Sequence, residues 1–182
     1  MKFTTLNHKK SRGFTLIELM IGIGIIAVAI IAILGRTSLT RGASEVKTEA
    51  DSIQSIIQAS KIAVGGQANM VGLTNAVVLA ANGFPSQMVS GTVVTHTWNC
   101  GVTVTSQTVP AANNAKGQID YASTPTAKCI GLINAVSGAI DSIYVGSLIV
   151  KAPNAALTTP ALIQAACATN AGLPTISIIF AR

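Results

Sequence analysis

The sequence predicts an α+β protein in which one long N-terminal helix packs on a globular domain with an antiparallel β-sheet. Three observations predict this fold. An apolar run over residues 14–34 passes without a break into an amphipathic helical pattern over 37–64. Alternating strand patterns follow at 92–98 and 101–109. Two further segments within 124–181 each have the pattern of a helix followed by a strand.

A basic leader precedes the apolar run. Four of the first twelve residues are Lys or Arg, whereas residues 14–34 carry Glu18 as their only charge. A helix of that length can cross the roughly 30 Å hydrocarbon core of a bilayer, and flanking cations stay on the cytoplasmic side. This charge asymmetry predicts that the residues after Leu34 are exported. Because no small-residue cleavage site follows Leu34, the apolar segment itself is expected to stay in the protein.

Glu18 is unusual inside such a segment. An unpaired acid costs about 2.5–3.5 kcal/mol at the centre of a membrane and somewhat less near an end. A residue that is kept at this cost is a candidate functional residue.

The junction between leader and helix resembles the processing site of the type IV pilins. Residues 9–20 contain the Lys-Lys-Ser-Arg-Gly end of a short basic leader followed by Phe-Thr-Leu-Ile-Glu-Leu-Met. The resemblance implies cleavage by a prepilin peptidase after Gly13 and N-methylation of the new amino terminus on Phe14. It also implies that Glu18, the fifth residue of the mature chain, acts in filament assembly. The alternative is a plain signal anchor with a Glu by chance.

The resemblance implies a pilin fold and a structural role, without enzymatic activity, cofactor or bound metal. The subunit would be held in the inner membrane with its N-terminus in the cytoplasm and its domain in the periplasm, and would then form an extracellular fibre with copies of itself. Its other partners would be a pilus assembly ATPase, a platform protein and a secretin. The expected parts are a cleaved leader (1–13), a membrane and filament-core segment (14–36), an amphipathic helix (37–64) and an exported domain (65–182).

A contact between subunits follows from the cleavage. In a fibre whose core is packed apolar helices, Glu18 needs a cationic partner, and cleavage creates one in the α-amino group of Phe14 on a neighbouring subunit. N-methylation, as the family implies it, keeps that charge. An uncut leader would instead bring several unpaired cations into the core.

The amphipathic half of the helix presents one apolar stripe toward the domain. The stripe is formed by Ala43, Val46, Ala50, Ile53, Ile57, Ser60 and Val64. The charged residues expected off the stripe are Glu45, Lys47, Glu49, Asp51 and Lys61. Gly65-Gly66 is expected to end the helix.

Three glycines interrupt the apolar half, and each costs about 1 kcal/mol relative to Ala in a helix. They are Gly22, Gly24 and Gly35. One interpretation is a segment that loosens when the subunit leaves lipid for a filament. The other is close packing of helices in lipid through small residues.

The exported domain is expected to contain three helices and four strands. Both late helices follow a Thr-Pro pair, with Thr124 and Thr159 as N-caps and proline at the first helical position. Pairing of the last two strands would place the C-terminal strand in the middle of a sheet. Besides the strand patterns at 92–98 and 101–109, the expected elements are helices 73–81, 127–136 and 161–168 and strands 142–151 and 175–181.

Composition argues against a nucleic-acid partner. Four of the twelve Lys and Arg lie in the leader and none of the six acids does, so cleavage lowers the net charge from +6 to +2. No basic cluster interleaved with aromatic residues remains. The lightly charged surface favours packing against copies of the same chain.

Three cysteines in an exported protein suggest one disulfide and one remaining thiol. Cys129 and Cys167 lie in the two Thr-Pro helices, and their positions are similar to those of the C-terminal disulfide of the type IV pilins, which implies this pair. Closing a loop of about 39 residues stabilises by about 4 kcal/mol on the chain-entropy model. Cys100 would then be a free buried thiol or bonded to another chain, and Cys100 with Cys129 is the rival pairing.

Other site types lack support in the sequence. His96 and Cys100 have a spacing that suits a nucleophile and its base on one strand face, but no third residue orients the base. Asp120 and Asp141 are isolated, so no metal-ligand cluster is expected. The missing acidic C-terminal cluster also argues against a calcium-binding pseudopilin.

Within the family, three features resemble the type IVb group: the proline-free helix, the domain after Gly65 and the late cysteine pair. Two others resemble type IVa, namely the Phe14 start and the short leader. The interpretation is a major subunit of a type IV pilus, closer to type IVb. The alternative is a minor pilin or a type II secretion pseudopilin with a tip-binding or secretion role.

Overall fold

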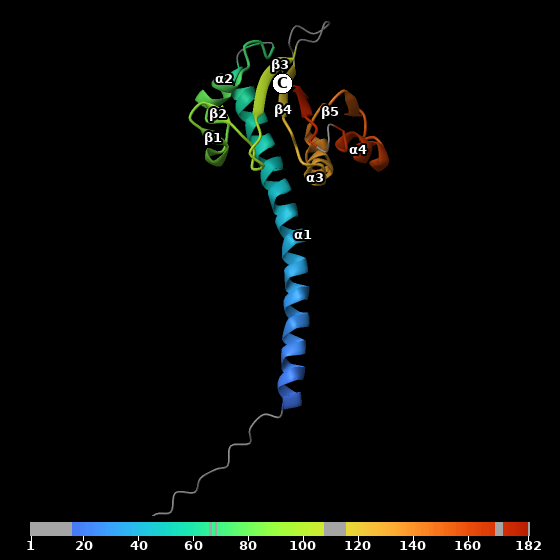
Figure 1. The fold of residues 1–182 in the computed structure, drawn as a ribbon. Coiled ribbons are helices and arrows are strands. Elements are labelled where there is room, and N and C mark those ends of the chain that lie inside the picture. The colour runs from blue at the N-terminus through green and yellow to red at the C-terminus, as the bar shows by residue number, and fades with distance from the viewer. Residues whose placement is uncertain (1–15, 66, 68, 108–115, 170–172, 182) are drawn as a thin grey trace, which may run out of the picture. The chain divides into compact units, whose positions relative to one another are not determined.

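One helix, α1, runs from Leu16 to Ala63, and a domain of helices and antiparallel strands follows it (Figure 1). The structure is a computed structural model, and the residues it describes are 16–65, 67, 69–107, 116–169 and 173–181. The side chains of residues 18, 28, 29 and 31–41 lie outside this description. The chain divides into two compact units, residues 1–41 and 42–182, and α1 contributes to both.

The expected N-terminal helix is confirmed over the described residues. It is unbroken from Leu16 to Ala63 in the single chain, and the turn at Val64 and Gly65 follows it. A side chain at Gly22 or Gly24 would meet nothing within 4 Å, so no contact inside the described chain requires glycine there. Whether these glycines serve loosening or close packing in a filament stays a prediction.

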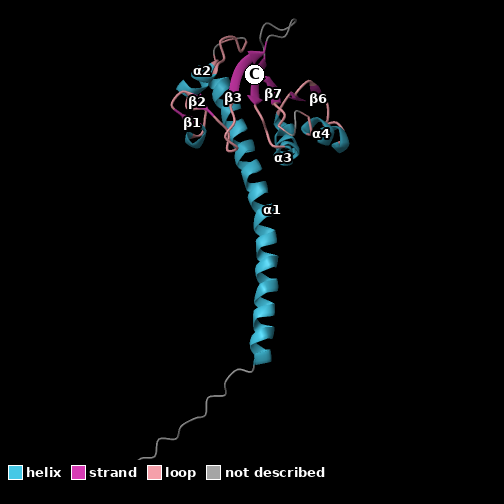
Figure 2. Ribbon diagram, viewed as in Figure 1, coloured by secondary structure: helices cyan, strands magenta, loops and turns pink. Residues whose placement is uncertain are grey.

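A five-stranded sheet forms the centre of the domain, with strand order β3-β4-β7-β5-β6 and every neighbouring pair antiparallel. Figure 2 shows its strands in magenta. The C-terminal strand lies between β4 and β5, as the sequence predicts. The strands are β3 (Val102–Gln107), β4 (Lys116–Tyr121), β5 (Ser142–Val145), β6 (Leu148–Lys151) and β7 (Ile176–Ala181).

Three further helices and a small hairpin complete the domain. The part of α1 that belongs to the domain lies with α2, β1 and β2 on one side and α3 and α4 on the other (Figure 1). The elements are α2 (Asn75–Ala80), β1 (Val89–Ser90), β2 (Val93–Val94), α3 (Thr126–Val136) and α4 (Pro160–Cys167), with short 3-10 turns at Ser86–Met88 and Ser137–Ala139.

The core lies between α1 and one face of the sheet. Ile53 and Ile56 of α1 are fully buried, as is Ile119 on the inner face of β4. Alternation along the strands places Gln118 and Asp120 on the opposite face. The buried arc of α1 is wider than the predicted stripe, because it includes Glu49, Ser52 and Ala59, while Ala43 is exposed.

Gly117 leaves room for an aromatic ring in this core. It pairs with Phe180 across β4 and β7, and a Cβ at Gly117 would lie 2.8 and 2.9 Å from two Phe180 ring carbons and closer still to a third. Gly117→Ala is therefore expected to lower the free energy of unfolding by about 1–3 kcal/mol through overpacking. Urea unfolding measures this, with Gly101→Ala as control because a Cβ there meets nothing within 4 Å. Equal midpoints for the two variants would contradict the packing.

The prediction of one strand over 142–151 is wrong in one respect. It is a hairpin of β5 and β6, in which Val145 pairs with Leu148 and Gly146 has a φ of +58°. A positive φ is easily adopted by glycine and allows the two-residue turn. Apolar residues lie on both sides of the turn, so the sequence pattern does not reveal it.

Two other expectations in the middle of the domain need correction. The strand predicted at 92–98 is reduced to β2 and an isolated bridge from Thr95 to Gly101. Strand β4 was not predicted, because its inner face offers only two large side chains, Ile119 and Tyr121, beside Gly117. The strand predicted at 101–109 corresponds to β3, and its last two residues lie outside the described chain.

The prediction of Thr as N-cap with proline at the first helical position is confirmed for one helix and wrong for the other. In α4, Thr159 is the N-cap and Pro160 the first helical residue, although the Thr159 side chain makes no capping hydrogen bond. In α3, Pro125 itself occupies the cap position and Thr124 lies before it. Thr124 is instead buried, and its N–H donates to the Pro174 carbonyl at 2.9 Å.

Candidate functional site

The residues that the sequence predicts for processing lie largely outside the described chain. Gly13 and Phe14 fall in the undescribed N-terminal segment, and Glu18 lies on α1 with its side chain outside the description. Cleavage, methylation and the charge pair therefore remain predictions.

The first turns of α1 expose a dense set of large apolar side chains. Nine of them between residues 16 and 30 have exposed fractions of 50–77%. They are Leu16, Ile17, Leu19, Met20, Ile21, Ile23, Ile25, Ile26 and Ile30. An exposed apolar surface of this extent marks a contact with another protein or with lipid.

Within the part of the chain that the structure describes, no helix has the length and hydropathy needed to cross a membrane. Anchoring by residues 14–36 stays a prediction.

A buried carboxylate joins α1 to the loop before β3. Glu49 is 1% exposed, which corrects the prediction that it lies off the buried stripe. Its Oε1 accepts a hydrogen bond of 2.6 Å from the Thr97 N–H and a second one from the Thr97 hydroxyl. Its Oε2 has no hydrogen-bond partner among the described residues. Since Thr97 is 48 positions away, no local sequence pattern predicts this contact.

His96 is locked beside this carboxylate by backbone groups. Its Nε2 lies 2.9 Å from the Ala122 carbonyl and its Nδ1 accepts from the Trp98 N–H at 3.2 Å, which together require the neutral ring with the proton on Nε2. The ring stacks on Tyr121 at 5.4 Å and meets Trp98 edge-on at 5.0 Å. With both nitrogens occupied, His96 is not a free base for the Cys100 thiol.

Tyr121 is buried on the other side of that stack. Burial, and after it the negative charge of the nearby Glu49 carboxylate, raise the pKa of the Tyr121 phenol well above its usual value of 10.0. The hydroxyl makes no direct hydrogen bond of normal geometry to any described atom. The cluster of Glu49, His96, Trp98 and Tyr121 thus ties α1, a loop and β4 together.

Tyr121→Phe is expected to make the protein less sensitive to alkali. Because the folded-state pKa lies above the unfolded one, the neutral phenol contributes stability that is complete below pH 10 and is lost as the pH rises above it. Above pH 10 the free energy of unfolding of the variant should fall less steeply with pH than that of the wild-type protein. The difference between the two slopes should be up to about 1.4 kcal/mol per pH unit. At pH 7 the phenol is neutral in the folded and unfolded states, so the difference in stability measured there is the reference for the alkaline slope. Urea unfolding at pH 7 and at several pH values above 10 measures this. Equal slopes of unfolding free energy against pH for the two proteins would contradict it.

The structure contains the disulfide between Cys129 in α3 and Cys167 at the end of α4, with the Cα atoms 5.9 Å apart. Both cysteines are fully buried, and the Thr126 hydroxyl donates to the Cys167 carbonyl at 3.0 Å. Cys100 is a free, half-buried thiol. The pairing implied by the resemblance is therefore present, and the rival Cys100–Cys129 pairing is not.

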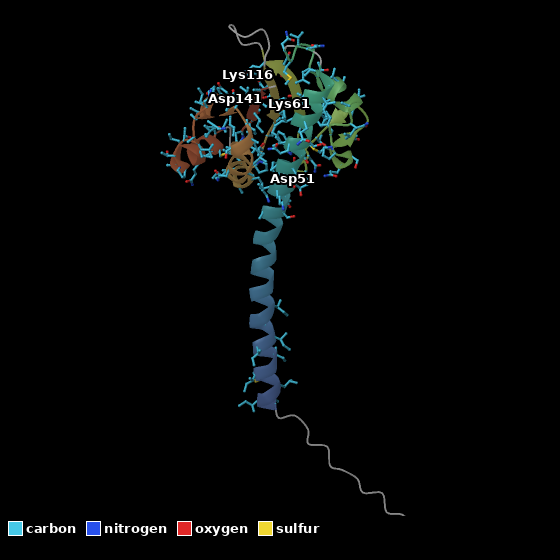
Figure 3. All side chains as sticks on the ribbon, turned by 180° about the vertical axis from the view of Figure 1, so that it is seen from behind. Asp51, Lys61, Lys116 and Asp141 are labelled. Carbon is cyan, nitrogen blue, oxygen red and sulfur yellow. A yellow bond between two sulfur atoms is a disulfide. The ribbon has the colours of Figure 1, made fainter. Side chains whose placement is uncertain are left out.

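Two ion pairs link elements of the domain, one between two helices and one between β4 and the residue before β5. Lys128 of α3 lies 2.7 Å from Glu45 of α1, and Lys116 of β4 lies 2.6 Å from Asp141 (Figure 3). All four side chains are partly exposed, so each pair contributes at most about 1 kcal/mol. Close approach of α3 to α1 depends more on Gly131, where a Cβ would lie 3.3 Å from Val46.

Two family models match the chain. The one described as PilS N terminal covers residues 43–181, and the prokaryotic N-terminal methylation motif covers residues 8–34. No curated protein matches the chain.

Two solved structures illustrate the similarity in fold. The type IVb pilin from Salmonella typhi has a TM-score of 0.58 at 15% identity, over 74% of this chain and 99% of that chain. TcpA, a type IV pilin from Vibrio cholerae El Tor biotype, has a TM-score of 0.52 at 12% identity, over 78% of this chain and 99% of that chain.

A long N-terminal helix on an antiparallel sheet, preceded by a methylation motif, is the architecture of a type IV pilin. These neighbours share the fold of the chain, and both are pilins. Since the match to PilS N terminal spans well over half of its residues, the chain belongs to that family of type IV pilins.

Proposed function

We propose that this chain is the major structural subunit of a type IV pilus of the type IVb group. The observation that supports it most is the combination, in one chain, of a methylation motif over residues 8–34 with a pilin domain over residues 43–181. The exposed apolar side chains of α1 at residues 16–30, within the methylation-motif match, provide a surface for lipid before assembly and for other subunits afterwards.

The proposed sequence of events begins in the inner membrane. The leader directs insertion with the N-terminus in the cytoplasm, and a prepilin peptidase then cuts after Gly13. Cleavage removes four cations and creates the α-amino group on Phe14, which is N-methylated. In the fibre this amino group pairs with Glu18 of a neighbouring subunit, so that both charges are neutralised inside an apolar core.

The proposed partners follow from these steps. They are other copies of the chain, the prepilin peptidase, an assembly ATPase, a platform protein and a secretin. The domain after Gly65 faces the periplasm before assembly and the medium afterwards.

Deletion of the gene, followed by electron microscopy of the cell surface and analysis of sheared fibres, tests this function. A major subunit is expected to dominate the sheared fraction, and its loss to remove the fibres. Restoring the gene on a plasmid controls for effects on neighbouring genes. Fibres that persist without this chain would contradict the proposal and favour a minor pilin or a pseudopilin.

A further inference from the structure

The face of the sheet that points away from the core carries a small polar hollow. It measures about 220 Å3 and is smaller than the ~300–1,000 Å3 of pockets for drug-sized ligands. Four strands and the β5–β6 turn contribute to it. Its lining residues are Gln107, Gln118, Tyr144, Gly146, Ser177 and Ile179.

A carboxylate next to the hollow holds two of its lining residues, Gln118 and Ser177. Asp120 accepts hydrogen bonds from the Ser177 hydroxyl at 2.5 Å and from Nε2 of Gln118 at 2.8 and 3.0 Å. Charge-assisted hydrogen bonds of this kind hold both partners in place. Because Nε2 of Gln118 is engaged, its amide oxygen is left as an acceptor.

Two further polar side chains line the hollow. Among the described residues, neither the side-chain amide of Gln107 nor the hydroxyl of Tyr144 makes a hydrogen bond. Together with Oε1 of Gln118 they offer two amide donors, two amide acceptors and one hydroxyl that can do either. The Tyr144 ring and the Ile179 side chain add apolar surface beside them.

The charges nearby disfavour an ionic ligand. Among the residues that the structure describes, no cationic side chain lines the hollow. The nearest one along β4, Lys116, is paired with Asp141 at 2.6 Å. The Asp120 carboxylate already accepts hydrogen bonds from the Ser177 hydroxyl and from Nε2 of Gln118, so it offers little to a cation and would repel an anion. A neutral ligand with many hydroxyls and one apolar face matches both the polar groups and the apolar surface.

We propose that the hollow on the outer face of the sheet binds one neutral pyranose ring, the size and chemistry of a terminal sugar in a glycan. The ring hydroxyls would bond the amides of Gln107 and Gln118 and the hydroxyl of Tyr144, with a C–H face of the sugar against the aromatic ring. This site goes beyond the proposed function, because it needs the folded domain and no assembly step.

The test uses the full chain, solubilised in a detergent without a sugar headgroup. Saturation-transfer NMR is measured with the methyl pyranosides of glucose, galactose, mannose and N-acetylglucosamine as probes. Transfer to at least one of them is expected for the wild-type chain. Gln107→Ala, which breaks no hydrogen bond within the described chain, and Tyr144→Ala should each weaken that binding about fivefold or more.

Gln87→Ala is the matched control, because Gln87 is exposed and does not line the hollow. It should bind like the wild-type chain. Transfer to none of the four probes, or equal binding by all three variants, would overturn the proposal. If the hollow bound an unrelated peptide and no pyranoside displaced it, the proposal would also be overturned.

Discussion

Glu18→Ala is expected to stop fibre growth while the subunit stays in the inner membrane. Each added subunit would bury the Phe14 ammonium without its partner, and removing one member of a buried ion pair costs about 3–5 kcal/mol. This weakens every addition step at least about 100-fold. Membrane insertion does not depend on the acid and should become slightly easier without it. Glu18→Asp keeps the charge on a shorter side chain and should retain part of the assembly.

The assay compares immunoblots of sheared fibres and of membranes. Asp51→Ala is the control, because Asp51 is an exposed acid on the same helix and belongs to the globular unit (Figure 3). It should assemble normally. Wild-type amounts of fibre from Glu18→Ala would rule out the charge pair, and loss of that variant from the membrane would show that the acid acts before assembly.

Removal of the disulfide is expected to cause the largest loss of stability. A sequence separation of 38 between Cys129 and Cys167 corresponds to about 4 kcal/mol on the chain-entropy model. Since whole domains are stable by about 5–15 kcal/mol, the double variant Cys129→Ala/Cys167→Ala should lose a large share of its stability. Urea unfolding of the solubilised chain measures it, and the reduced wild-type chain should approach the same midpoint.

Cys100→Ala is the matched control for this experiment. Because Cys100 is a free thiol, its removal should leave the midpoint of the oxidised protein almost unchanged. Tryptic mapping checks the pairing itself, since cleavage after Lys61, Lys116, Lys128 and Lys151 places the three cysteines on different peptides. A bridged peptide that contains Cys100 would overturn the assignment.

Periodicity in the sequence predicts the parts of the fold that repeat locally. The long N-terminal helix follows from the pattern of one continuous segment. The central position of β7 follows from the expected pairing of the last two strand segments. Strand β4 escapes prediction because its inner face contains Gly117, whose small size matters only once Phe180 from β7 lies against it. The hairpin of β5 and β6 escapes because apolar residues flank its turn closely.

The candidate sites also differ in whether local sequence predicts them. The motif around Gly13 and Glu18 lies in one short stretch of sequence and can be recognised there. The burial of Glu49 depends on Thr97, which folding brings to it from a distant loop. The outer hollow combines residues from four strands, so its composition appears only when the sheet order is known.

The central claim is that cleavage after Gly13 makes this chain the repeating unit of a surface fibre. Mass spectrometry of the dominant protein in sheared fibres tests it most directly. The expected protein starts at N-methylated Phe14 and lacks the thirteen-residue leader. A dominant fibre protein that still carries the leader, or fibres in which this chain is only a trace component, would contradict the claim.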